Sequence, residues 1–216
     1  AGRPFADWQL QWLACEGVTD VVYCIAHLGD QIRAFAGNGS AWGLSITYSD
    51  EGAQLRGTAG ALADAARAGL LADRFLVLYG DSYLDLSVAE MWRTFEDSAP
   101  CPMMISVFLN DGALDRSNVR FRHGSVELYD KHVDDPAAAG MRHIDYGLSA
   151  LDRGVLLEGP PAPAAPWDLS DLQHRLSIEG RLAGYEVSRR FFEVGSPAGM
   201  DALEAHLGTH DDADPA

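Results

Sequence analysis

Two carboxylates in the chain stand at the ends of apolar runs, each with a glycine close by. Asp81 comes after the apolar run 75–79 and Gly80, and Glu193 ends a later apolar run two residues before Gly195. Mg²⁺ is commonly held by one or two carboxylates together with substrate phosphate oxygens, so the pair could share a divalent cation. An equally open alternative is that Asp81 only caps the helix that follows it.

The elements that must position these carboxylates alternate along the chain. The apolar run 75–79 is typical of a buried strand. Helices and strands taking turns are typical of an α/β fold, so we expect a Rossmann-like three-layer, mostly parallel sheet with helices on both faces. In such sheets ligands bind outside the carboxyl ends of the strands, where Asp81 would lie. We expect helices near 5–13, 28–37, 57–71, 87–96, 167–180 and 197–207, and strands near 18–26, 43–50, 75–79, 103–109 and 184–193.

Turn and cap residues refine this pattern. His123 and Gly124 separate two short alternating runs within 118–131, which predicts a small antiparallel hairpin insertion. Asp168 or Ser170 is expected to cap the helix 167–180, with Gly180 as its stop.

Composition limits the classes of partner. The chain has 216 residues, 47% of them hydrophobic, and a formal charge of −16, so it can bury a core but lacks the clustered basic residues that bind nucleic acid or an anionic membrane. Three widely spaced cysteines (Cys15, Cys24 and Cys101) with apolar neighbours predict buried free thiols and a cytoplasmic location. We expect one domain over 1–207 and a disordered acidic tail over 208–216.

A series of motifs, taken in order, resembles the sugar-phosphate nucleotidyltransferases, also called nucleotide-sugar pyrophosphorylases. The motifs are "GRPFADWQLQWLACEGVTDVVYCIAHLGDQI", "WGLSITYSDEGAQLRGTAGAL", "VLYGDSYLDL", "VELYDK", "IDYGLSAL" and "FFEVGSPAGMDAL". The resemblance spans about residues 1–207, and it is strongest to mannose-1-phosphate and heptose-1-phosphate guanylyltransferase-like proteins. It implies the nucleotide-diphospho-sugar transferase fold.

The resemblance also implies roles at the nucleotide and metal sites. Asp81 looks like the metal-binding, catalytic aspartate, and Glu193 falls where the family usually has a second metal-binding aspartate, with Mg²⁺ as the cofactor. "GTAGAL" resembles the segment that contacts the nucleotide base, with Gly57, Thr58 and Gly60 allowing close approach. A tightly packed helix start is the alternative for these three residues.

For the sugar-phosphate site, Asp130 and Lys131 resemble the family's Glu-Lys pair, in which the catalytic lysine neutralises the acceptor phosphate. An ordinary exposed lysine at a hairpin end is the alternative. Asp145 and Gly147 match the family's Asn-x-Gly stretch at the sugar pocket, with Asp145 in place of the usual asparagine. His143, close by, is more typical of a structural histidine than of a catalyst.

The implied reaction joins a sugar 1-phosphate to a nucleoside triphosphate, giving an NDP-sugar and pyrophosphate. The family's glycine-rich loop with its arginine, which grips the triphosphate after the first strand, has no counterpart here. We therefore expect an N-terminally truncated enzyme, impaired or inactive as this chain. The alternative is a catalytically dead homologue that binds a nucleotide sugar or regulates a partner subunit. A homo-oligomer is also allowed by the sequence.

Overall fold

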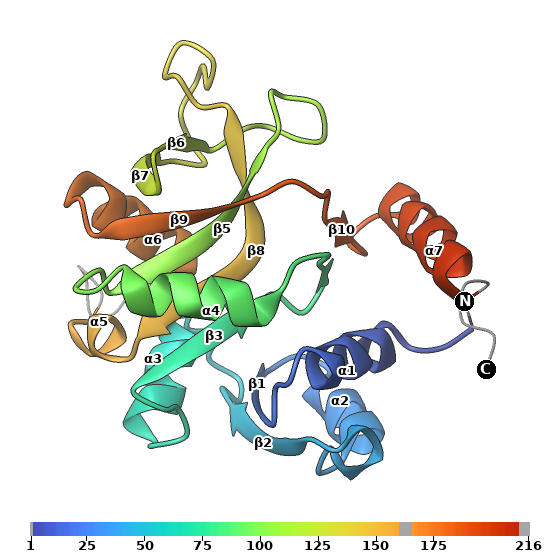
Figure 1. The fold of residues 1–216 in the computed structure, drawn as a ribbon. Helices are drawn as coiled ribbons and strands as arrows, with labels where there is room; N and C mark the ends of the chain where they lie inside the picture. Colours follow the sequence, from blue (N-terminus) through green and yellow to red (C-terminus); the bar gives the residue numbers. More distant parts are fainter. Residues whose placement is uncertain (1, 160–165, 212–216) are drawn as a thin grey trace.

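The computed structural model describes residues 2–159 and 166–211 (Figure 1). Helices and strands alternate through most of the chain, as expected for an α/β protein. The helices are α1 (Phe5–Cys15), α2 (Gly29–Ala36), the 3₁₀ helix η1 (Ser40–Trp42), α3 (Thr58–Arg67), α4 (Val88–Asp97), α5 (Gly154–Leu157), α6 (Leu169–Ile178) and α7 (Pro197–Asp211). The strands are β1 (Asp20–Ile25), β2 (Ser45–Asp50), β3 (Arg74–Leu78), β4 (Ser82–Tyr83), β5 (Met103–Leu109), β6 (Val119–Arg122), β7 (Ser125–Tyr129), β8 (His143–Asp152), β9 (Leu182–Val187) and β10 (Phe192–Glu193).

The main sheet is mixed, and a Rossmann-like, mostly parallel sheet is not what the structure shows. Its order is β3-β8-β5-β9-β7-β6, and β5–β9 is its parallel pair. β8 runs antiparallel between β3 and β5. A pairing of Val119 with His143 joins β6 back to β8, so β8, β5, β9, β7 and β6 form a closed, barrel-like ring. The sequence prediction missed β8, although its almost continuous burial is typical of a central strand.

Helices cover both faces of this sheet, as expected for three layers. Met103, Ile105 and Val107 of β5 pack with α3, α5 and α6 on one face. Met104, next to them on the same strand, packs with α4 on the opposite face. The alternation follows from the period of two along a strand.

β1 and β2 form a separate parallel pair. Among the described residues, β1 has no partner on its other edge, and β3 has none on the edge away from β8. Val22 and Cys24 of β1 and Phe75 and Val77 of β3 are half-buried against the same core cluster, which also contains alanines of α3. The predicted central strand 75–79 is therefore an edge strand within the described residues.

Several local predictions are confirmed. His123 and Gly124 both have positive φ, at 50° and 81°, as a two-residue hairpin turn requires, and they join β6 to β7. Asp168 caps α6 in a reciprocal capping box with Asp171.

Other local predictions need correction. The predicted last strand is two strands, β9 and β10, separated by the irregular segment 188–191. Cys15 is exposed rather than buried, while Cys24 and Cys101 are half-buried, and all three are free thiols. α7 continues to Asp211, into the expected tail; residues 212–216 lie outside the described residues, as does most of the proline-rich loop 159–166.

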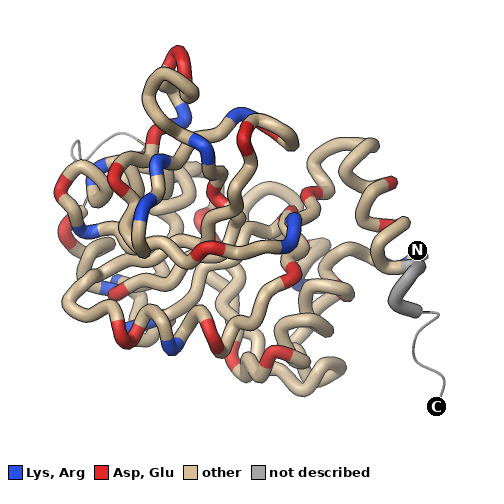
Figure 2. The backbone as a smooth tube through the Cα atoms, turned by 45° about the horizontal axis from the view of Figure 1, so that its top comes forward, with Lys and Arg blue, Asp and Glu red and all other residues tan. Residues whose placement is uncertain are grey.

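Charged residues of both signs are interleaved over the surface of the described chain (Figure 2). Most arginines are paired with a carboxylate: those at 3, 33, 56, 67, 74, 120, 122, 142, 153, 175, 181 and 189 form ion pairs. Among the described helices, none combines the length and the apolar character needed to cross a lipid bilayer.

Candidate functional site

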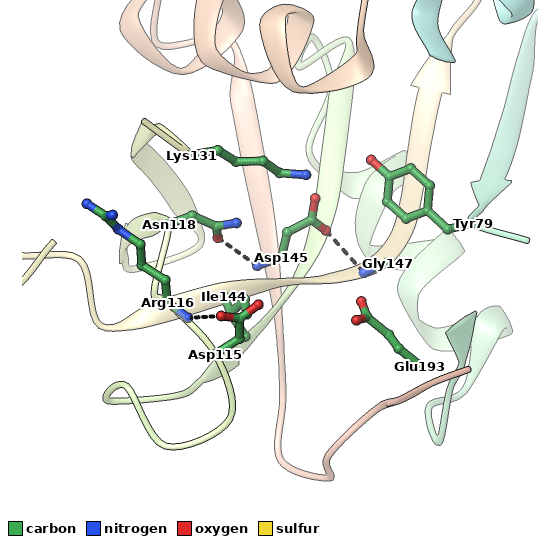
Figure 3. Close-up of a pocket in the computed structure, with 9 residues that line it drawn as sticks. All are labelled: Tyr79, Asp115, Arg116, Asn118, Lys131, Ile144, Asp145, Gly147 and Glu193. Carbon is green, nitrogen blue, oxygen red and sulfur yellow. Dashed lines mark hydrogen bonds between the residues drawn. The ribbon is translucent and has the colours of Figure 1, made fainter. Parts of the chain in front are cut away.

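A pocket of about 240 Å³ opens where β7, β8 and β10 approach one another (Figure 3). The pocket is lined by Tyr79, Asp115, Arg116, Asn118, Lys131, Ile144, Asp145, Gly147 and Glu193. The structure thus brings together four predicted site residues: Lys131, Asp145, Gly147 and Glu193.

An irregularity in β8 aims Asp145 into this pocket. The pairing of β5 with β8 shifts register between Ile105 and Val107, and Gly147 has a φ of 101° that favours glycine. A Cβ at Gly147 would lie 3.0 Å from the Ser82 hydroxyl. The hydroxyl of buried Ser106 bonds both the amide and the carbonyl of Leu148, so the main chain remains paired across the irregularity.

Hydrogen bonds fix the Asp145 carboxylate in one orientation. Its Oδ1 accepts from Gly147 N at 3.1 Å, and its Oδ2 accepts from Tyr129 Oη and Gln173 Nε2, each at 3.2 Å. The Asp145 main-chain amide donates to Asn118 Oδ1 at 3.0 Å. Burial raises the pKa of Asp145 despite these donors, because desolvation disfavours the charged form.

Lys131, which follows β7, is the only lysine of the whole sequence. Its side chain reaches over the pocket toward Asp145 (Figure 3). Its charge acts to lower the pKa values of both Asp145 and Glu193. Within the part of the chain that the structure describes, Lys131 makes no ion pair of its own. The ammonium group is therefore available to an anionic ligand.

Glu193 and Asp81 are held near each other by a short strand pair. Glu193 of β10 lies opposite Ser82 of β4, and Val194 N donates to the carbonyl of Asp81 at 2.9 Å. Burial, and next the charge of Asp81, raise the pKa of Glu193. Asp81 itself is exposed and is not among the lining residues.

The side chains around these two carboxylates limit how many protein ligands a cation could have. Over residues 2–159 and 166–211, no group of three or more histidine, cysteine, aspartate or glutamate side chains could hold a metal ion. Two carboxylates whose mutual repulsion raises a pKa still fit a Mg²⁺ ion that takes its other oxygens from substrate phosphates and water.

Asp130 and the glycine segment lie outside the pocket lining. Asp130 Oδ1 accepts from His132 N at 2.7 Å, which orders the turn that carries Lys131. At the start of α3, Ala59 N and Gly60 N both donate to the carbonyl of Trp167, and Asp168 Oδ1 accepts from Thr58 N. A Cβ at Gly57 would lie 2.6 Å from the Trp167 carbonyl oxygen. These contacts are those of a tightly packed helix start, and a nucleotide-binding role for Gly57, Thr58 and Gly60 stays a prediction.

The sequence prediction missed the remaining lining residues: Tyr79, Asp115, Arg116, Asn118 and Ile144. The apolar run 75–79 places Tyr79 in a strand, and burial raises the pKa of its phenol. Asn118 directly precedes β6, and an asparagine at a strand end is a usable signal, because its side chain often hydrogen-bonds main-chain groups. His143 behaves as a structural residue, since its ring packs against Phe121 and Nε2 lies 3.1 Å from Glu186 Oε1.

Comparison with curated proteins finds relatives of one kind. The chain is 38% identical over 109 residues to N-acetylmuramate alpha-1-phosphate uridylyltransferase of Neisseria meningitidis serogroup B, covering 50% of this chain and 46% of that protein. It is 25% identical over 145 residues to glucose-1-phosphate thymidylyltransferase of Streptomyces antibioticus, covering 67% of this chain and 34% of that protein. The matched stretches thus span half or less of the length of these relatives. No family model matches the chain.

Solved structures show the same fold. HddC of Yersinia pseudotuberculosis superposes with a TM-score of 0.76 at 18% identity, covering 95% of this chain and 86% of that one. The same protein in complex with GMP-PN gives 0.74 at 20% identity, with the same coverage. A glucose-1-phosphate thymidylyltransferase-like structure of Bacillus anthracis, in complex with a sucrose, gives 0.75 at 19% identity, covering 91% of this chain and 79% of that one.

Proposed function

We propose, from its homology to sugar-1-phosphate nucleotidyltransferases, that this chain belongs to an enzyme that joins a sugar 1-phosphate to a nucleoside triphosphate. An oxygen of the acceptor phosphate attacks the α-phosphorus, the bond from that phosphorus to the bridging oxygen breaks, and pyrophosphate leaves. The observation that carries the proposal is the convergence of the only lysine, a partly buried aspartate and a strand-end glutamate on one pocket of about 240 Å³.

The charged residues at the pocket have different roles in the proposed reaction. Lys131, without an ion pair among the described residues, holds the acceptor phosphate, and Asp145 accepts a hydrogen bond from a sugar hydroxyl beside it. The acceptor phosphate is already ionised, so the reaction needs alignment and charge stabilisation rather than a strong base. Asp81 and Glu193 would hold Mg²⁺, which supplies positive charge to the phosphate oxygens when bound.

We propose further that residues of a longer protein complete the nucleotide side of this site. β1 and β3 each have an open edge and pack against the same core cluster, so a strand placed between them would pair on both sides and join the two sheets. If that strand ran parallel to β1, the loop after it would lie at the carboxyl end of β1. Main-chain amides of a glycine-rich loop are the usual cradle for a triphosphate.

The test measures pyrophosphate release with Mg²⁺ from two proteins: residues 1–216, and a version extended upstream by its own coding sequence. UTP, dTTP and GTP are each combined with a panel of sugar 1-phosphates. We expect turnover in the extended version and a fall in kcat/KM of roughly 10²–10³-fold for Lys131→Met in that version. Arg122→Met, an exposed change in the hairpin, is the matched control. Absence of turnover with every pair would refute the proposal.

A further inference from the structure

Gln9 is a buried amide on α1 that no step of the proposed reaction uses. It is 4% exposed and lies beside fully buried Leu10, on a helix whose other inward side chains are mostly apolar. A buried polar side chain of this kind is expected to have hydrogen-bond partners. Gln9 finds both of its partners some 70 residues away in sequence, at the end of β3.

The Gln9 amide spans a turn of the main chain. Its Nε2 donates to the carbonyl of Tyr79 at 3.0 Å and to the carbonyl of Ser82 at 2.8 Å. Ser82 N also donates to the Tyr79 carbonyl, at 3.3 Å, which closes the turn 79–82. One NH₂ group has two hydrogens, so a single glutamine satisfies two carbonyls three residues apart.

The turn 79–82 connects three parts of the candidate site. Tyr79 lines the pocket, and the Asp81 carbonyl accepts from Val194 N. Ser82 pairs with Glu193 across β4 and β10. A displacement of this turn would therefore move both carboxylates and one wall of the pocket together.

We propose that Gln9 is a positioning residue, which holds the turn 79–82 so that Asp81 and Glu193 keep their mutual placement at the pocket. The inference rests on the proposed function for its catalytic meaning, but its structural content does not depend on turnover. Asparagine at this position is one methylene shorter and cannot reach both carbonyls. Methionine fills a similar volume and donates no hydrogen bond, so it removes the donor with little change in packing.

The test compares Gln9→Met with Gln11→Met, an exposed glutamine on the same helix. Amide hydrogen exchange is followed by NMR in residues 1–216, which requires no activity. In Gln9→Met we expect the Ser82 and Val194 amides to exchange about tenfold faster or more, while amides of β5 keep the wild-type rate. Gln11→Met should match wild type at all of these amides. Equal exchange of Ser82 and Val194 in the two variants would overturn the proposal.

Kinetics of the extended version give a second readout that a purely structural role would not produce. We expect Gln9→Met to lower kcat about tenfold or more and to change KM for the sugar 1-phosphate less than kcat, because Lys131, which holds the acceptor phosphate in the proposed reaction, follows β7 and is not part of the turn 79–82. Equal falls in kcat for Gln9→Met and Gln11→Met would also overturn the proposal. If the exchange rates change as expected and wild type shows no turnover with any substrate pair, the proposed function fails while Gln9 still holds the turn.

Discussion

Asp145 accepts three hydrogen bonds, yet its pKa is raised, because burial opposes its charge more strongly than the donors of Gly147, Gln173 and Tyr129 favour it. Lys131 opposes the shift through its positive charge. The pocket thus holds a partly desolvated carboxylate next to a cation that has no ion-pair partner within the described residues. An anionic ligand with hydroxyl groups can satisfy both, since its phosphate meets Lys131 and a hydroxyl donates to Asp145.

The raised pKa of Asp145 makes its contribution to stability depend on pH. A folded pKa above the unfolded value means that the folded state binds the proton more tightly, so stability is full below the unfolded pKa of about 3.9 and falls as pH rises through the folded pKa. In Asp145→Asn this loss is absent. We expect the Tm of the variant minus that of wild type to rise between pH 4 and pH 7.

Calorimetry at several pH values in this range measures that difference. Asp97→Asn, at the exposed end of α4, controls for the general loss of one negative charge. If the Tm difference for Asp145→Asn has the same pH dependence as that for Asp97→Asn, Asp145 does not titrate as described here.

At the scale of elements, the contact between α3 and the segment before α6 ties two distant parts of the chain together. Thr58 Oγ1 accepts from Leu169 N at 2.7 Å, while Asp168 Oδ1 accepts from Thr58 N. Each helix start therefore helps to cap the other. The close approach depends on Gly57, which has a φ of 78° and no room for a side chain.

Gly57 and Gly69, on either side of α3, allow a matched comparison. Both have positive φ, at 78° and 73°, but a Cβ at Gly69 meets nothing within 4 Å, whereas one at Gly57 meets the Trp167 main chain at 2.6–2.8 Å. We expect Gly69→Ala to lower the free energy of unfolding by about 1–2 kcal/mol through strain. Gly57→Ala should lose roughly 1–3 kcal/mol more, through overpacking and because the Gly57 backbone, at φ 78° and ψ 166°, lies in a region nearly limited to glycine.

Urea denaturation of the two variants measures this difference in unfolding free energy. Equal losses would show that the α3 start can move away from Trp167 at little cost. The close packing described here would then not be what requires glycine at position 57.

At the scale of the whole molecule, the most consequential feature is the pair of open edges at β1 and β3. Unpaired strand edges expose main-chain donors and acceptors that other elements usually cover. Here the two strands pack against one core cluster and belong to separate sheets of the described chain. If a strand of a longer protein pairs with both, it turns two sheets into one.

Hydrogen exchange detected by mass spectrometry tests that arrangement. In the extended version we expect peptides covering 20–25 and 74–78 to exchange about tenfold more slowly or more than in residues 1–216. A peptide covering β5, which is paired on both sides, should show the same rate in both proteins. Unchanged exchange at both open edges would argue against a strand between them.

The sequence by itself determined the identity of most elements. The spacing of apolar residues is a local property, and so is the placement of the glycine, proline and capping residues that end an element. A few neighbouring residues are therefore enough to predict β5, the hairpin at His123 and Gly124, and the cap at Asp168. The same local pattern, with the family resemblance, indicated Lys131, Asp145, Gly147 and Glu193, which the structure brings to one pocket.

The tertiary structure decided what depends on partners distant in sequence. The antiparallel place of β8 between β3 and β5, the aim of Asp145 and the two hydrogen bonds of Gln9 each depend on contacts between segments far apart in the chain. Periodicity tells which face of a strand is buried but not which strand lies beside it, because apolar side chains of similar size pack against many partners. A glutamine on a helix likewise has the same local sequence pattern whether its side chain is buried and holds a turn or is exposed to water, and only the fold distinguishes the two.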